Sequence, residues 1–277
     1  MYKEELNVLS YNILWRAIDA VEFMSHCKIN NINECSQNIA NIISKIGLEY
    51  LNTNSYDFIG LQEAKKQQTF QELLSNINNI NPTFMNNYKI LDARDNLGGV
   101  ITMYNKNKFT LEKQINGSLA LKKDDGRPFL ISIYKEGIIH INVHMPHKNQ
   151  NSSFKVLKKA LEKYDMSKYR VIFAGDFNMD NPEDNNIFNS ISTFKKEPKK
   201  LYTCCKSRKN ASYYKTYDHI YDNMTTPSIY RHLIIDVSKD KFFIDGKPLM
   251  SDHLPVFAKF PRMNPIIKGV RYLENKN

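Results

Sequence analysis

Four short segments between residues 88 and 143 constrain the fold more than any other feature of the sequence. The segments 88–91, 99–104, 129–134 and 138–143 have the composition of strands, and Gly, Asn and Asp turn signals separate them. Several neighbours are joined too tightly for parallel strands, which need a crossover of about a dozen residues or more. The sequence therefore favours antiparallel pairing here and argues against a doubly wound parallel sheet.

Helical segments alternate with further strands along the rest of the chain. Apolar residues that recur every three or four positions predict helices at about 33–51, 66–79 and 152–164. Short apolar runs predict strands at about 6–11, 57–61, 170–174, 217–221, 228–236 and 256–260. Because strands outnumber helices, we predict the α/β fold class, with two packed mixed β-sheets and helices outside them.

The composition is that of a folded globular protein. The chain has 277 residues, of which 42% are hydrophobic and 25% charged, and this excludes a wholly disordered chain. No linker divides it, so we expect a single domain over 1–277, with a core at about 6–260 and a short basic C-terminal tail. No apolar run reaches the roughly 20 residues needed to span a bilayer.

Cysteine usage bears on the compartment. The four cysteines, Cys27, Cys35, Cys204 and Cys205, lack zinc-ligand spacing, and we expect free thiols in a reducing compartment. The N-terminus has no basic-then-apolar signal pattern. We therefore expect an intracellular protein, cytoplasmic or nuclear and not secreted, that is a monomer without an obligate protein partner.

Positive charge is concentrated in one segment. The chain has 39 Lys and Arg against 29 Asp and Glu, a net charge of +10 that points to a polyanionic partner. Eight basic residues and one acid lie between positions 195 and 215. The candidate substrate-binding residues there are Lys195, Lys196, Lys199, Lys200, Tyr202, Lys206, Arg208, Lys209, Tyr213 and Tyr214. Such a segment can follow a phosphate backbone and stack on unpaired bases, and we favour this interpretation over the alternative of a solvated loop in a lysine-rich protein.

Polar side chains recur directly after or before apolar strands. They are Asn12, Glu63, His144, Asp176, Asn178, Asp218, Asp252 and His253. Each has a structural explanation alone, as a turn former, a helix-opening charge or a loop histidine. Sheets bring strand ends together at one edge, however, so the whole set could converge on a single cleft. We expect one site.

The ordered set of motifs resembles a known family. These motifs are Ser10-Tyr11-Asn12, Leu61-Gln62-Glu63, Val143-His144, Gly175-Asp176-Phe177-Asn178, Tyr217-Asp218-His219-Ile220 and Ser251-Asp252-His253. In this order they are similar to those of the endonuclease/exonuclease/phosphatase superfamily, to which deoxyribonuclease I belongs. The resemblance covers about residues 6–260. It implies a four-layer α/β sandwich, in agreement with the paired mixed sheets predicted above.

The resemblance also implies a metal site. Phosphate ester hydrolysis needs charge neutralisation at the phosphoryl group, which a hard cation with few oxygen ligands supplies. By resemblance, Glu63 is the principal ligand of Mg²⁺, with Asn12 and Asp252 near the ion. Mn²⁺ could substitute for Mg²⁺.

The remaining motif residues take catalytic roles by the same resemblance. His253 would contact the scissile phosphate, with its ring oriented by Asp218. Asp176 would position or deprotonate the attacking water, and Asn178 would hold a phosphoryl oxygen. His144 stands where abasic-site endonucleases have tyrosine, which resembles the deoxyribonuclease I and sphingomyelinase branches, where a second histidine is a general acid.

These observations favour a Mg²⁺-dependent phosphodiesterase that acts on nucleic acid. An inositol-phosphate phosphatase or a sphingomyelinase-type phosphodiesterase of the same fold is the alternative, because the basic segment suits an inositol polyphosphate nearly as well as DNA. A catalytically inactive nucleic-acid-binding module is the alternative of another class. The choice between DNA and RNA, and between endonuclease and exonuclease action, stays open.

Overall fold

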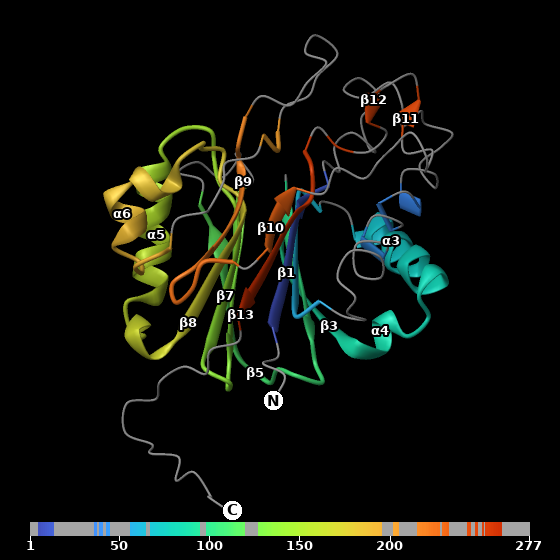
Figure 1. The fold of residues 1–277 in the computed structure, drawn as a ribbon, viewed down its shortest axis with the longest axis horizontal. Helices are drawn as coiled ribbons and strands as arrows, with labels where there is room; N and C mark the ends of the chain where they lie inside the picture. The colour runs from blue at the N-terminus through green and yellow to red at the C-terminus, as the bar shows by residue number, and fades with distance from the viewer. Residues whose placement is uncertain are drawn as a thin grey trace, which may run out of the picture.

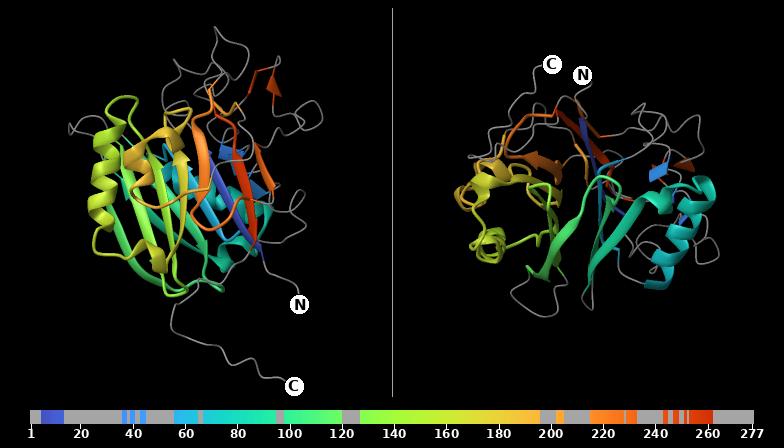
Figure 2. Two further views of the ribbon diagram at one scale, coloured as in Figure 1. Left: turned by 60° about the vertical axis from the view of Figure 1, so that its left-hand side comes forward. Right: turned by 90° about the horizontal axis from the view of Figure 1, so that it is seen from below.

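Two β-sheets pack face to face, and helices cover the outer side of each (Figures 1 and 2). The computed structural model describes residues 5–13, 56–64, 67–94, 98–119, 127–195, 202–204, 215–227, 229–232, 251 and 253–261, with short pieces at 36–37, 39–40, 43–44, 243–244 and 247–248. The arrangement confirms the predicted α/β class with paired mixed sheets inside two helical layers.

The first sheet has six strands in the order β10-β13-β1-β2-β4-β3. Its strands are β1 (Glu5–Asn12), β2 (Phe58–Gln62), β3 (Tyr88–Arg94), β4 (Gly99–Asn105), β10 (Ile229–His232) and β13 (Val256–Pro261). β1 and β2 are parallel, whereas the other neighbours are antiparallel. In the parallel pair Asn12 lies opposite Gln62, so both strands end at the same edge.

The second sheet has five strands in the order β5-β6-β7-β8-β9. They are β5 (Leu111–Ser118), β6 (Pro128–Tyr134), β7 (Ile138–His144), β8 (Arg170–Asp176) and β9 (Asp218–Asp222). Only β7 and β8 are parallel here, and their register pairs His144 with Asp176. A separate two-stranded ribbon joins β11 (Phe243–Ile244) to β12 (Lys247–Pro248).

Short helices complete the outer layers. α3 (Gln67–Ile80) and α4 (Phe84–Asn87) lie over the first sheet, whereas α5 (Gln150–Leu161) and α6 (Asn186–Asn189) lie over the second (Figure 1). Two single-turn 3₁₀ helices are η2 (Met166–Lys168) and η3 (Pro182–Asp184). In the described part of the chain, no helix is long and apolar enough to cross a membrane.

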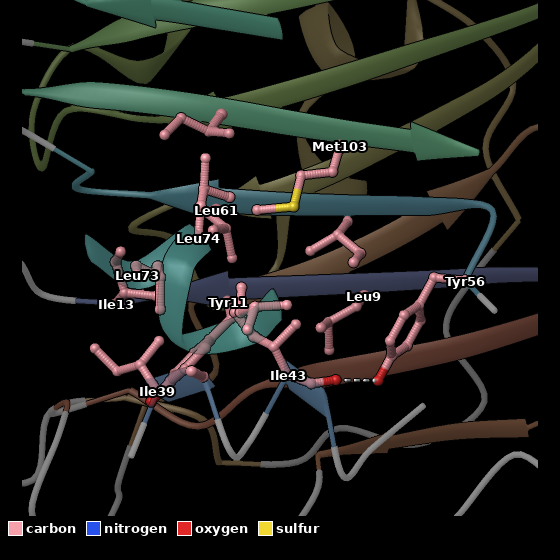
Figure 3. Packing of buried hydrophobic residues seen from close by; sticks show 14 of the residues in the cluster. Leu9, Tyr11, Ile13, Ile39, Ile43, Tyr56, Leu61, Leu73, Leu74 and Met103 are labelled. Carbon is pink, nitrogen blue, oxygen red and sulfur yellow. Dashed lines mark hydrogen bonds between the residues drawn. The ribbon is translucent and has the colours of Figure 1, made fainter. Parts of the chain in front are cut away.

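The apolar core beneath α3 joins it to the first sheet. Leu73 and Leu74 of the helix pack with Leu9 and Tyr11 of β1 in one buried cluster (Figure 3). Ile39 and Ile43, from the predicted 33–51 helix, are buried in the same cluster, and the Tyr56 hydroxyl donates to the Ile43 carbonyl at 3.3 Å. Most of that predicted helix lies outside the described residues.

The layer between the sheets changes character along the strands. On β1 the side chains directed toward the second sheet run from Leu6 and Val8, which are in an apolar cluster, to Ser10 and Asn12, which have polar partners. Because side chains alternate across a strand, a single strand can supply an apolar core at one end and a polar edge at the other. We call the edge at Asn12 the rim.

A buried amide bridge fixes the two sheets against each other just below the rim. The Gln62 side-chain amide donates to Asn142 Oδ1 at 2.8 Å and to Ser10 Oγ at 3.2 Å. Asn142 in turn donates to the Ile101 carbonyl at 2.8 Å. Buried polar groups must be satisfied by well-placed partners, so this bridge specifies one relative position of β1, β2 and β7. It thereby sets the ends of these strands side by side.

Candidate active site

The rim collects most of the polar residues that the sequence predicted. The strand ends and adjoining loops place there Asn12, Glu63, His144, Asp176, Asn178, Asp218 and His253. Asp252 lies outside the described residues. β1, β2, β7 and β8 run toward the rim, whereas β9 starts from it, and the Asp176–Asp218 pair of the antiparallel register joins the last two.

Asn12 connects the carboxylates of the two sheets. Its side-chain amide donates to Asp176 Oδ2 at 2.9 Å and lies 3.3 Å from Glu63 Oε1. His144 faces the same two groups, with Nε2 at 3.5 Å from Asp176 Oδ2 and 3.6 Å from Glu63 Oε1. The four side chains come from four strand ends and form one cluster.

Asp218 and His253 form the second part of the site. Asp218 Oδ2 lies 2.8 Å from His253 Nδ1, and the backbone N–H of Asp218 donates to Thr203 Oγ1 at 3.1 Å. A carboxylate on Nδ1 fixes the ring orientation and directs Nε2 away from itself. His253 Nε2 lies 3.8 Å from Asp176 Oδ2, which links the pair to the Asn12 cluster.

Ser251 ties the last motif to the first. Its hydroxyl donates to the Asn12 carbonyl at 2.7 Å and accepts the backbone N–H of His253 at 3.0 Å. Ser251 is buried, so these bonds are shielded from water. The serine of the Ser-Asp-His motif therefore positions the histidine and has no direct contact with the carboxylates of the cluster.

Asp176 is the most desolvated carboxylate of the Asn12 cluster. Burial raises its pKa above the usual aspartate value. His253 opposes this rise, Asp218 adds to it through like-charge repulsion, and hydrogen bonds from the Asn178 backbone and the Asn12 amide lower the pKa. Because burial is the largest of these effects, the ionised carboxylate is costly to the fold.

Two site residues hold a left-handed backbone conformation. Glu63 has φ 59° and Asn178 has φ 48°. Asparagine tolerates this region, whereas a residue such as glutamate pays about 1–2 kcal/mol for it. The turn at Glu63 is fixed by the Ala64 N–H, which donates to the Gly99 carbonyl at 3.0 Å, and a Cβ on Gly99 would meet Ala64 O at 2.2 Å. Such strain is typical of functional sites.

Asn178 is oriented by the backbone of a neighbouring segment. Its side-chain amide donates to the Met145 carbonyl at 2.8 Å, and its backbone N–H donates to Asp176 Oδ1 at 2.9 Å. Gly175, which precedes Asp176, has φ 145°, and a Cβ there would meet the Val143 carbonyl at 2.2 Å. Glycine is therefore required for the close approach of β8 to β7 beside the site.

Three residues that the sequence did not single out as site residues contact those that it did. Thr203 holds the Asp218 backbone, Cys204 Sγ lies 3.3 Å from His253 Nε2, and Arg127 contacts the His144 ring. The only sequence signal for the first two is their position within the basic segment that leads to Asp218. Cys204 is disulfide-bonded, so the expectation of a free thiol is wrong at this position, and its partner lies outside the described residues.

Among the lysines, arginine and tyrosines of the basic segment, three lie within the described residues. Lys195 and Tyr202 are exposed, the latter at 63%, and Lys215 Nζ lies 3.4 Å from Asp180 Oδ2. Tyr202 directly precedes Thr203, so an open aromatic ring stands beside the residue that holds Asp218. The residues outside the described part of the chain are Lys196, Lys199, Lys200, Lys206, Arg208, Lys209, Tyr213 and Tyr214.

The donors at the rim fit a divalent cation. Ligand atoms of Asp176, Asp218 and His253 lie within 4.8 Å of one another. Asp218 Oδ1 is buried without a hydrogen-bond partner, and the Glu63 side chain is 19% exposed against 2% for Asp176. The rim thus offers an orphaned carboxylate oxygen on Asp218 and an accessible carboxylate on Glu63, and both are the oxygen ligands that hard cations prefer.

The sequence decides the family. Residues 9–227 match the sequence model of the Endonuclease/Exonuclease/phosphatase family. The chain belongs to this family. Members of the endonuclease/exonuclease/phosphatase family are phosphoric ester hydrolases that generally depend on a divalent metal, in agreement with the donors at the rim.

Solved structures show the same fold. A family protein from Bacteroides thetaiotaomicron is 15% identical with a TM-score of 0.65, covering 94% of this chain and 98% of that protein. D. rerio TDP2 complexed with a single-strand DNA product is 14% identical with a TM-score of 0.63, covering 94% and 100%. A mannosyl-6-phosphatase from B. thetaiotaomicron is 19% identical with a TM-score of 0.62, covering 91% and 98%.

A viral protein is similar in sequence. The uncharacterized protein L684 of Acanthamoeba polyphaga mimivirus is 25% identical over 278 residues, which cover 91% of this chain and 49% of L684. The chain thus spans about half the length of this relative.

Proposed function

We propose that the protein is a Mg²⁺-dependent phosphodiesterase that hydrolyses phosphodiester bonds in nucleic acid. The observation that carries the proposal is the link between the two parts of the rim. Asp176 accepts a hydrogen bond from the Asn12 amide at 2.9 Å, and its Oδ2 lies 3.8 Å from His253 Nε2. The candidate base, Asp176, and the candidate phosphate contact, His253, therefore lie next to each other. General base catalysis and charge stabilisation both need this proximity.

Glu63, Asn12 and Asp252 would hold the metal ion. Bound there, Mg²⁺ supplies charge neutralisation at the phosphoryl oxygens and stabilises the leaving oxygen. The Glu63 carboxylate is accessible and is held by a strained turn, so it can meet a hydrated ion without rearrangement of the backbone.

Asp176 orients the attacking water and accepts its proton. A carboxylate whose pKa is raised by burial is a stronger base than a solvated one, and its Oδ1 is kept in place by the Asn178 N–H. Asn178 lies two residues after Asp176 and would hold a phosphoryl oxygen. Asp176 thus acts on the attacking water, and Asn178 acts on the phosphoryl group that the water attacks.

The two histidines serve the phosphoryl group and the leaving group. His253, held at Nδ1 by Asp218, donates from Nε2 to a phosphoryl oxygen. His144, on the other side of Asp176, gives a proton to the leaving oxygen. Their separate positions around one carboxylate are what this division of roles requires.

Nucleic acid is the substrate that the charge and the aromatic residues favour. The basic segment carries most of the net positive charge, and Tyr202 offers an exposed ring beside Asp218 for stacking on an unpaired base. The structurally similar D. rerio TDP2 holds a single-strand DNA product. A phosphatase for sugar or inositol phosphates is the second candidate, because a mannosyl-6-phosphatase has the same fold.

A substrate panel tests the proposal. Purified protein with Mg²⁺, with Mn²⁺ and with excess chelator is offered single- and double-stranded DNA, RNA, a 5′-tyrosyl end, an abasic site, inositol phosphates, a sugar 6-phosphate and sphingomyelin. We expect metal-dependent cleavage of at least one nucleic acid. Turnover confined to phosphate monoesters would replace the proposal with the phosphatase.

A further inference from the structure

Arg127 lies at the edge of the candidate site without an assigned role. It precedes β6, and its carbonyl accepts the Leu119 N–H at 2.7 Å, which closes the β5–β6 hairpin. β6 pairs with β7, so the half-buried Arg127 side chain lies beside the strand that ends in His144. Its backbone position is therefore fixed by the second sheet, independently of the site.

The guanidinium meets the imidazole ring of His144. One terminal nitrogen of Arg127 lies 2.9 Å from His144 Nδ1 and also contacts Nε2. A guanidinium has five N–H donors, no acceptor and a permanent charge, whereas a neutral imidazole offers a single lone pair. The contact therefore uses a small part of the donor capacity of Arg127 and neutralises none of its charge.

No carboxylate pairs with Arg127 among the residues that the structure describes. Arg170, at the other end of the sheets, shows what a satisfied arginine looks like. It is bonded to Asp222 through two nitrogens and also donates to Thr225 Oγ1 and the Pro261 carbonyl. Partly buried cations are normally paired, so the unused donors of Arg127 indicate a place for an anion.

We propose that Arg127 binds a non-bridging phosphoryl oxygen of the substrate and gives up its contact with His144 when it does so. The inference rests on the proposed function, in which the rim binds a phosphate ester. The ring that Arg127 touches lies 3.5 Å from Asp176 and 3.6 Å from Glu63, so the guanidinium stands next to the position of the reacting phosphate.

The exchange of partners couples substrate binding to the second histidine. In the absence of phosphate, the guanidinium occupies the lone pair of His144. Once a phosphoryl oxygen takes the guanidinium, the freed lone pair of His144 takes up a proton from solvent, and the ring can direct this N–H toward the leaving oxygen. The planar, two-pronged donor set of arginine matches phosphate, whereas a lysine would supply charge without the fork.

Phosphate binding tests Arg127 without reliance on turnover. Inorganic phosphate is titrated by calorimetry, with and without Mg²⁺, into the wild type, Arg127→Gln, Arg127→Lys and Lys168→Gln. Lys168 is 76% exposed at the end of β8 opposite Asp176, so its substitution removes the same charge away from the site. Far-ultraviolet circular dichroism shows which variants are folded.

We expect Arg127→Gln to weaken phosphate binding about 10-fold to 100-fold, as for loss of charge-assisted hydrogen bonds. Arg127→Lys should lose less affinity and Lys168→Gln almost none. In the wild type, phosphate should also shift the ¹⁵N resonances of the His144 ring, and in Arg127→Gln this shift should disappear. If Arg127→Gln does not fold, the phosphate affinity of Arg127→Lys and the His144 resonances of the wild type still test whether Arg127 binds phosphate.

Two failures can be told apart. If the wild type binds phosphate and the Arg127 variants bind it equally well, Arg127 only holds His144 and the inference falls while the proposed function stands. If the wild type binds no phosphate under either condition, the proposed function fails and the inference fails with it.

Discussion

Strands β8 and β9 carry buried charged side chains at both ends, and the two ends are built differently. At the end remote from the rim, Arg170 and Asp222 form a closed pair, with the shortest contact at 2.6 Å between Nη2 and Oδ2. The two side chains are 1% and 0% exposed. Each charge has an opposite charge and additional hydrogen bonds: the Thr225 hydroxyl accepts from Arg170 and donates to Asp222.

At the rim the same strands bring carboxylates together. Asp176 and Asp218 are opposite each other in the register, and Glu63 joins Asp176 through Asn12. Within the described part of the chain, the Asp176 and Asp218 side chains contact amides and imidazoles, and burial raises the pKa of Asp176. Charge that is matched stabilises the fold, whereas unmatched charge costs stability and is kept where chemistry needs it.

Neutralising the rim should give the largest effect. Asp176→Asn removes the proposed base, so kcat/KM should fall about 10³-fold. Since the pKa of Asp176 is raised in the fold, the ionised form is destabilising as the pH rises above that pKa. Asp176→Asn should therefore raise the free energy of unfolding at pH 7 by about 1 kcal/mol.

The measurement combines steady-state kinetics with urea unfolding in excess chelator. Asp222→Asn is the matched control, since it alters an aspartate of β9 at the far end and should lower stability. A rim variant that loses both activity and stability would mean that Asp176 is structural.

Breaking the far pair should do the opposite. Arg170→Ala leaves Asp222 as an uncompensated buried charge, and the free energy of unfolding should fall by about 3–5 kcal/mol. The kcat/KM of the folded fraction should be unchanged at low temperature, since the pair lies at the other end of β8. Urea unfolding and active-site titration measure the two quantities. If Arg170→Ala lowered the free energy of unfolding by less than a surface variant such as Lys168→Gln, the comparison of the two ends would be contradicted.

His140 is a third buried titratable group, which lies between the two ends compared above. It is four residues before His144 on β7, stacks on Phe58 at 4.9 Å between centroids, and both of its buried ring nitrogens lack a partner. Burial lowers the pKa of His140 from 6.5 to about 3. Here a titratable group is buried with neither a matching charge nor a place in the site.

Acid should therefore destabilise the protein through His140. The unfolded chain binds the proton more tightly, so stability is lost as pH falls below 6.5, by about 2 kcal/mol between pH 7 and pH 5. His140→Leu should remove this part of the pH dependence, and substitution of the exposed His147 should not. The urea unfolding midpoints of the wild type and the variants are measured at pH 7 and pH 5. If His140→Leu loses as much stability between these two pH values as the wild type does, the assignment to His140 is wrong.

Much of the fold was predictable because its strands are apolar on at least one face. The polar edge strand β5 was missed, since Leu111–Ser118 shows exposed or half-buried side chains along its length and lacks an apolar run. The described part of the predicted 228–236 strand is β10, Ile229–His232, and the rest of that prediction lies outside the described residues. Edge strands exposed to solvent carry a weak sequence signal.

The site was predictable to the extent that polar residues end buried strands. Asn12, Asp176 and His144 could be grouped on this basis alone. Arg127 could not, because its contact depends on a long side chain beside a neighbouring strand, and the Arg170–Asp222 pair depends on the register of β8 and β9.

The central claim is that the carboxylates at the rim serve a metal-dependent hydrolysis of phosphate esters. The most direct test compares wild type and Glu63→Gln on the best substrate of the panel, with Mg²⁺ and with excess chelator, alongside urea unfolding. We predict that the wild type is active only with the metal, that Glu63→Gln loses about 10²-fold or more in kcat/KM, and that the variant is as stable as the wild type. Full activity in excess chelator, or an unimpaired Glu63→Gln, would contradict the account.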